Sequence, residues 1–363
     1  MSMGSEDSAR QAMFVSCTEC SWERELKGSS VISGIEQSCP TCQGPVAISI
    51  GRKTKVDTIN LEAKQLDEEY LIELDADTDA RYSSLVSKVM PSVVVAMTVA
   101  AVADSEYKID DHAVLIDELK EKALDTRTML EDLEERQKIT GASRVSVGFP
   151  DNDESAKRFI RMYLGGDTRS RTMDGGLFQD FGLIEVSEKE EEERVVRLGK
   201  GMKAFSEVQP KTDAIEKRSY QRRNTYDIEV PVWYSDEDCE KLAQAIADRA
   251  ELEKRLMYSL LVRIKNFRAP TIYTLIDSEF RLLTAGEEEV RKMWGIPDDS
   301  DWETLDDEEA ERVRKKITNG MIATLGRMRE LRLVIAQRKG RSNVYYITDD
   351  IGKRLLDKWE PQE

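Results

Sequence analysis

The chain has only one histidine, His112, and lacks the short motifs of nucleotide-binding and hydrolytic enzymes. It contains no Gly-x-x-x-x-Gly-Lys-Ser/Thr loop, no Gly-x-Gly-x-x-Gly and no Gly-x-Ser-x-Gly. A single histidine excludes most catalytic sets that pair a histidine base with a second histidine or with a cysteine. Acidic residues are abundant, but they fall in runs typical of a surface. We therefore expect a protein that is not an enzyme.

Long apolar runs are also missing. The most hydrophobic stretch, residues 93–103, is about a dozen residues long, whereas a helix needs about 20 to cross a bilayer. The start of the chain is polar and has no apolar signal-peptide segment. We therefore expect a cytoplasmic protein without a membrane partner.

The chain carries a large excess of negative charge. The chain of 363 residues has a formal net charge of −17. Such a charge opposes non-specific binding of the whole molecule to DNA, so a nucleic-acid site has to be a local basic patch.

Cysteines are few, but four of the five form two pairs near the start of the chain. The pairs are Cys17-Thr-Glu-Cys20 and Cys39-Pro-Thr-Cys42, with 18 residues between them. Each Cys-x-x-Cys turn places two thiolates on one side of a tight loop, and two turns complete a tetrahedral shell around zinc. Four sulfur ligands leave no open position, so the pattern predicts a structural Zn²⁺ in a zinc ribbon.

Two disulfides or a redox-active dithiol pair are the alternatives. In a reducing cytosol, paired Cys-x-x-Cys turns favour a metal over a disulfide. The fifth cysteine, Cys239, lies in an acidic helical stretch and is expected to be a packed or surface thiol.

Hydrophobic periodicity and turn residues predict an α+β, mainly helical protein. It comprises a zinc ribbon (1–52), a helical bundle or dimerisation domain (53–140), a winged helix (141–209), a basic linker with an acidic helix (210–262) and a second winged helix (263–363).

One predicted helix, over residues 111–138, carries Leu115, Leu119, Leu130 and Leu133 at spacings typical of a helical seam. The seam fits a dimerisation helix, which would make the protein a homodimer, and it fits an internal helical bundle equally well.

The two winged segments repeat one pattern. Helices are followed by a strand, a polar tip and a returning strand, the order of a winged helix-turn-helix. Apolar residues match in register, pairing Phe178 with Met328, Phe181 with Leu331, Leu183 with Leu333 and Ile184 with Val334.

A helix, a Leu-Ile or Leu-Val strand start, a hairpin and a turn led by Gly201 or Gly352 together resemble the winged helix-turn-helix domains of archaeal transcription regulators. The resemblance is one of fold. With the four-cysteine ribbon, it implies a DNA-binding protein that contacts the transcription machinery or another protein.

The two copies differ in the charge of the tip. The first tip carries four consecutive glutamates, residues 190–193, which would repel phosphates. The second tip and the helix before it are basic, so we expect the second copy to bind double-stranded DNA. A solvated helix face is the plain alternative. The predicted DNA-binding residues are Arg312, Arg314, Lys315, Lys316, Arg327, Arg329, Arg338, Lys339 and Arg341, with Asn319 and Thr324 reading base edges.

These expectations describe a transcription regulator that binds DNA through its C-terminal winged helix and uses the zinc ribbon for assembly. The alternative is a non-catalytic scaffold subunit of a replication, mobile-element or defence complex, whose winged domains bind proteins. The basic second tip favours the regulator, whereas the acidic first tip and the net charge favour the scaffold.

Overall fold

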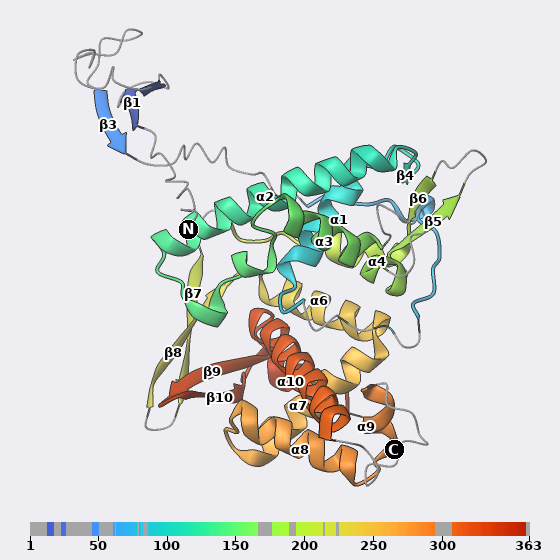
Figure 1. The fold of residues 1–363 in the computed structure, drawn as a ribbon, viewed down its shortest axis with the longest axis vertical. Coiled ribbons are helices and arrows are strands. Elements are labelled where there is room, and N and C mark those ends of the chain that lie inside the picture. Colours follow the sequence, from blue (N-terminus) through green and yellow to red (C-terminus); the bar gives the residue numbers. More distant parts are fainter. Residues whose placement is uncertain are drawn as a thin grey trace, which may run out of the picture. The chain divides into compact units, whose positions relative to one another are not determined.

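The computed structural model describes residues 13–17, 23–26, 46–50, 61, 63–77, 80, 82, 86–165, 176–188, 194–212, 215–222, 225–294 and 307–360. The chain forms two compact units, Met1–Ile59 and Asn60–Glu363. The protein is α+β and mainly helical, as the sequence predicts (Figure 1). Within the described ranges, no helix is long and apolar enough to cross a membrane.

The first unit contains a small antiparallel sheet in the order β2-β1-β3. Its strands are β1 (Met13–Cys17), β2 (Glu23–Leu26) and β3 (Val46–Ile50). Cys17, the last residue of β1, pairs with Val46, the first residue of β3. Cys20, Cys39 and Cys42 lie outside the described residues, as does the side chain of Cys17.

The second unit begins with the first of the two repeats, in which helices surround a three-stranded antiparallel sheet. The strand order of this sheet is β4-β6-β5. All residues of α1 from Met90 to Ala100 are buried, which explains why this helix is apolar on every side. Pro91 lies in its first turn, where its missing N–H costs nothing. The elements are η2 (Glu68–Tyr70), α1 (Met90–Val102), β4 (Lys108–Ile109), α2 (His112–Arg136), η3 (Gly141–Ser143), η4 (Ser146–Gly148), α3 (Asp153–Leu164), α4 (Leu177–Asp180), β5 (Ile184–Glu188), β6 (Arg194–Leu198), η6 (Lys200–Met202) and α5 (Lys203–Ser206).

The leucine seam of α2 packs inside this repeat. Leu115, Leu119, Leu130 and Leu133 are all buried within the single chain. This burial favours the internal bundle, because these four leucines are not available to a second subunit.

The predicted boundary at residue 140 falls inside one packed body. Strand β4 pairs with β6, placing Lys108 opposite Arg197 and Ile109 opposite Val196. Strand β4, which precedes residue 140, and the β5–β6 hairpin, which follows it, consequently belong to one sheet. A two-residue strand such as β4 gives no recognisable sequence signal, because strand patterns need about four residues to alternate.

The predicted basic linker is an antiparallel hairpin of β7 (Glu216–Arg222) and β8 (Thr225–Val232). The acidic helix that follows, α6 (Asp236–Arg249), begins where the sequence predicts. The Ser235 side chain caps it by accepting a hydrogen bond of 3.0 Å from the N–H of Asp238.

The second repeat ends the chain. Thr271 bridges to Val344 on β10, so this copy also adds a short strand segment to its hairpin. Its elements are α7 (Glu251–Phe267), α8 (Ile272–Thr284), α9 (Glu288–Met293), α10 (Asp307–Glu330), β9 (Val334–Lys339), β10 (Ser342–Ile347) and α11 (Ile351–Lys358).

The turn from helix to strand has the same geometry in both repeats. The Leu183 N–H donates to the Phe178 carbonyl at 2.7 Å, and the Leu333 N–H donates to the Met328 carbonyl at 2.8 Å. The residue before each leucine has a positive φ, 59° at Gly182 and 56° at Arg332. An arginine is strained there. Contacts of its buried side chain with Asp236 and with the Tyr234 carbonyl hold it in place.

Candidate nucleic-acid interface

The tip of the β9–β10 hairpin is a tight, basic turn. Lys339 pairs with Ser342, which leaves Gly340 and Arg341 as a two-residue loop. Gly340 has a φ of +61°, the left-handed value that such loops require. Arg338, Lys339 and Arg341 are exposed, and the Lys339 ammonium lies 5.9 Å from the centre of the Tyr346 ring. The tip therefore projects three cations over a few residues.

The β7–β8 hairpin packs against the β9–β10 hairpin, here called the wing, and Figure 1 shows the two hairpins side by side. Tyr220 and Ile228 form a small apolar cluster with Ile335 of β9, and Tyr346 of β10 packs against it. The Tyr220 hydroxyl donates to Asp350 at 3.0 Å. The wing is thus held in a fixed direction by a second hairpin, whose contacts span more than a hundred residues of sequence.

Charged groups strengthen this attachment. Arg218 of β7 forms ion pairs with Asp236 at 2.9 Å and with Asp350 at 2.8 Å. Burial by itself would raise the pKa of Asp350. Hydrogen bonds from the Ile351 N–H, Tyr220 and Arg218 outweigh it, so that the pKa lies below its usual value. Both carboxylates stay ionised at neutral pH and hold the guanidinium.

Helix α10 has one buried face and one exposed stripe. Ile317, Met321, Leu325 and Met328 are buried at helical spacing. The exposed stripe consists of Arg312, Lys315, Asn319 and Ile322.

Three of the predicted helix cations already have partners. Arg312 pairs with Glu308 at 2.6 Å, and Arg314 pairs with Asp277 of α8 at 2.9 Å. Lys316 donates to the Trp294 carbonyl at 2.5 Å. Exposed ion pairs such as the first two are weak and exchange readily with phosphate. Lys315, Arg338 and Arg341 form no ion pair with any described residue.

Arg327 was expected at the DNA surface, but it lies in the core. Only 1% of the residue is exposed, and it forms an ion pair of 2.6 Å with Glu253 of α7. It also donates to the Val86 carbonyl and stacks on Tyr82 at 4.5 Å. Thr324, expected to read base edges, is buried beside it and donates to Glu253. Neither side chain can reach DNA in this structure.

Arg329 is half-buried on the opposite side of α10 from this network. It donates to the Ser143 hydroxyl at 3.3 Å, and burial lowers the pKa of its guanidinium. Its neighbour Glu330 is buried and caps α1, accepting from the N–H groups of Val89 at 2.8 Å and Met90 at 2.7 Å. This end of α10 therefore joins the two repeats.

Lys88 is a buried cation next to that junction. Its ammonium donates to the Ala142 carbonyl at 2.8 Å and lies near Glu330, Arg329 and Glu134. Burial lowers the pKa of Lys88 to about 8, although Glu330 opposes the shift. The unfolded chain, with an ordinary lysine pKa, binds more protons between about pH 8 and 10.4, so this lysine makes stability rise with pH in that window.

We expect the free energy of unfolding to gain on the order of 1 kcal/mol from Lys88 between pH 7.5 and 9. The Lys88→Met variant should lack this gain. Urea unfolding of both proteins at the two pH values measures the difference, and the comparison cancels buried groups such as Cys239, whose raised pKa acts in the opposite direction. Equal pH dependence of the two proteins would contradict the assignment.

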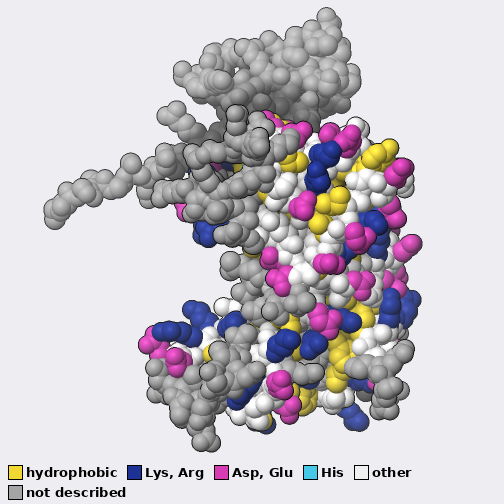
Figure 2. Space-filling model, turned by 90° about the vertical axis from the view of Figure 1, so that its right-hand side faces the viewer, with side chains coloured by type: hydrophobic (Ala, Val, Ile, Leu, Met, Phe, Trp, Pro, Cys, Tyr) yellow, Lys and Arg dark blue, Asp and Glu magenta, His cyan; other side chains and the backbone are white. Residues whose placement is uncertain are grey.

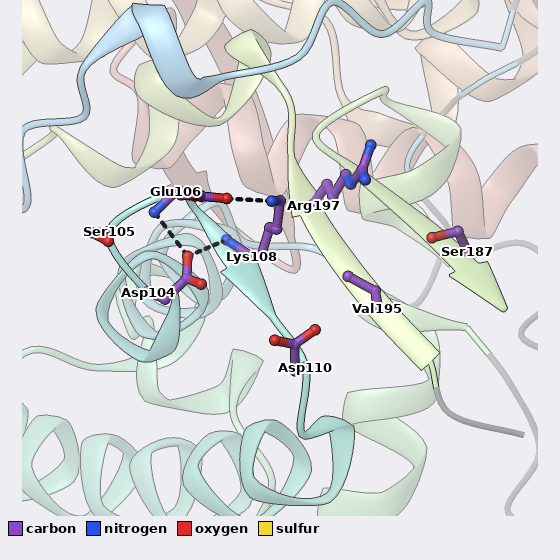
Figure 3. A pocket seen from close by; sticks show the side chains of 8 residues that line it. All are labelled: Asp104, Ser105, Glu106, Lys108, Asp110, Ser187, Val195 and Arg197. Atoms are coloured by element: carbon purple, nitrogen blue, oxygen red, sulfur yellow. Dashed lines mark hydrogen bonds and ion pairs between the residues drawn. The ribbon is translucent and has the colours of Figure 1, made fainter. Parts of the chain in front are cut away.

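A cavity of about 380 Å³ lies at the edge of the first repeat (Figure 3). Asp104 accepts from the N–H groups of Glu106 at 2.8 Å and Lys108 at 2.9 Å, and Glu106 pairs with Lys108. These carboxylates stabilise the turn that leads into β4. Arg197 and Asp110 complete a lining of mixed charge.

On the face shown in Figure 2, acidic and basic side chains are interspersed. Elsewhere in the described chain, no group of three or more histidine, cysteine, aspartate and glutamate side chains could hold a metal ion.

Comparisons with protein-family models, with curated proteins and with solved structures gave no match to this chain.

Sequence reasoning missed two features near this tip. The first is the β7–β8 hairpin, because the basic run of residues 217–223, a candidate DNA contact by sequence, hides the strand alternation and is typical of a linker. The second is Ile322, which is 51% exposed. Its signal was available, since position 322 falls off the apolar face defined by Ile317, Met321 and Leu325.

Proposed function

We propose that the protein is a DNA-binding transcription regulator that contacts double-stranded DNA through its C-terminal repeat. In this proposal, α7 to β10 form a winged helix-turn-helix, with α10 in the major groove and the β9–β10 tip on the backbone or minor groove. The observation that carries the proposal is the combination, in one repeat, of a polar stripe exposed on α10 and a braced tip with three exposed cations.

Electrostatics limit the site to this patch. With a net charge of −17, most of the molecule repels phosphate, so attraction has to come from the wing and from Lys315. Each phosphate contact releases condensed counterions, and binding weakens steeply with salt. Binding of the intact protein to a duplex of random sequence between 50 and 200 mM salt tests the proposal. The absence of binding at the lowest salt concentration would refute it.

The acidic first repeat supports the alternative function. The sequence between β5 and β6 contains four consecutive glutamates, whereas residues 338–341 contain three cations. A protein that binds no duplex but co-purifies stably with a protein partner would be the scaffold of a larger complex.

We also propose a structural zinc ion held by Cys17, Cys20, Cys39 and Cys42. The backbone register supports it, because Cys17 lies opposite Val46, four residues after Cys42. Four residues span at most about 14 Å, so the chain length between Val46 and Cys42 allows Cys42 to share a metal shell with Cys17. A closed four-sulfur shell would fold this unit without taking part in chemistry.

We expect one zinc ion per chain by elemental analysis, and less than half of that in a Cys39→Ser, Cys42→Ser variant. Cys239→Ser is the matched control and should retain the metal, because that thiol is buried in the other unit. A zinc-free protein with four titratable thiols, or with two disulfides, would overturn the proposal.

A further inference from the structure

Ile322 stands out on the exposed stripe of α10. Its neighbours along the stripe are Asn319 and Lys315, and it is the one large apolar residue exposed on the described part of this helix. The other residues of the stripe are polar or charged. The exposed half of the Ile322 side chain contributes nothing to the fold, since it remains in water.

We propose that Asn319 and Ile322 are the specificity-determining residues of the DNA site and that they read adjacent base pairs containing A·T. This inference rests on the proposed function. In the major groove, an asparagine amide can bond adenine N6 and N7 together, and an apolar side chain can contact the thymine methyl group. Both contacts therefore select an A·T base pair.

The spacing of the two side chains fits this reading. Residues three apart on a helix are separated by about 4.5 Å along the axis. The separation is close to the rise of about 3.4 Å between neighbouring base pairs. Lys315, one turn before Asn319 on the same stripe, is exposed and placed to contact phosphate at the groove edge.

Several other side chains of α10 are engaged in contacts within the fold. Thr324 and Arg327 are buried with Glu253, Arg329 contacts Ser143, and Lys316 is bonded to the Trp294 carbonyl. Gly320 is also excluded, because the Trp294 ring packs directly against it and a Cβ atom there would lie 2.6 Å from that ring. Asn319 and Ile322 remain exposed on the stripe, whereas the exposed cations near the start of α10, Arg312 and Arg314, pair with Glu308 and Asp277.

The test begins with selection of duplexes from a random library by the intact protein. The selected sequence should contain an A·T-rich step. Asn319→Ala should lower the preference for that sequence over a single-base change by about 5- to 150-fold. Replacing the contacted thymine by deoxyuridine removes only one methyl group and should weaken wild-type binding about fourfold. It should leave the binding of Ile322→Ala unchanged.

Val114→Ala is the matched control, since Val114 is an exposed aliphatic residue on α2. It should keep the wild-type response to deoxyuridine. Selection without any preferred sequence, or an Ile322→Ala variant that still loses affinity with deoxyuridine, overturns the inference while salt-dependent DNA binding stands. Loss of all duplex binding at low salt by the wild-type protein overturns the proposed function itself.

Discussion

Replacing Arg338, Lys339 and Arg341 by alanine is expected to lower the affinity for duplex DNA by on the order of 100-fold at 0.1 M salt. The reason is counterion release, because each lost phosphate contact reduces the slope of log K against log salt by about 0.9. Three contacts therefore remove about 2.7 from the slope. Binding measured by fluorescence anisotropy across a salt series gives both quantities, and the loss should be uniform across DNA sequences.

A charge-matched control separates contact from net charge. Lys353, Arg354 and Lys358 are exposed on α11, outside the proposed surface. Their triple alanine variant changes the net charge by the same amount and should keep nearly the full slope. Similar losses in both variants would mean that the β9–β10 tip has no special role and that affinity depends only on the net charge of the molecule, which both variants make more negative by the same amount.

The second large effect concerns stability. Arg327→Met is expected to destabilise the protein by about 3–5 kcal/mol, because it leaves the Glu253 carboxylate buried without its cation. Both side chains are 2% exposed, so water cannot replace the guanidinium. The double variant Arg327→Met, Glu253→Leu removes both charges and should recover most of the loss.

Urea unfolding measures these differences, and Arg312→Met serves as the control. Arg312 is 70% exposed in its pair with Glu308, so its replacement should change the unfolding free energy by less than about 1 kcal/mol. If Arg327→Met changed the unfolding free energy as little as the control does, Arg327 would face solvent. The sequence-based prediction that it contacts DNA would then stand.

Local signals in the sequence predicted local structure well. The cap at Ser235, the hairpin around Gly340 and the two-copy pattern of the helix-to-strand turn all depend on residues within one or two turns of one another. The mainly helical α+β class follows from the same periodicities.

The distribution of charge between core and surface could not be predicted in the same way. Arg327 and Arg338 look alike in the sequence. Arg327 is buried because Glu253, 74 residues away, lies beside it in the fold. The attachment of β4 to β6 and of Tyr220 to Asp350 is equally non-local. The proposed DNA surface is consequently smaller than the sequence suggested, and it comprises the β9–β10 tip, Lys315, Asn319 and Ile322.

The hydrogen bonds from Val89 and Met90 to Glu330 have a consequence for how the chain can be divided. The first helix of one repeat obtains its cap from the last residue of a helix in the other. A fragment that ends before α10 would expose α1 with two inward-facing N–H groups and no acceptor. Neither repeat is therefore a free-standing folding unit, and the tandem arrangement should melt cooperatively, as one body.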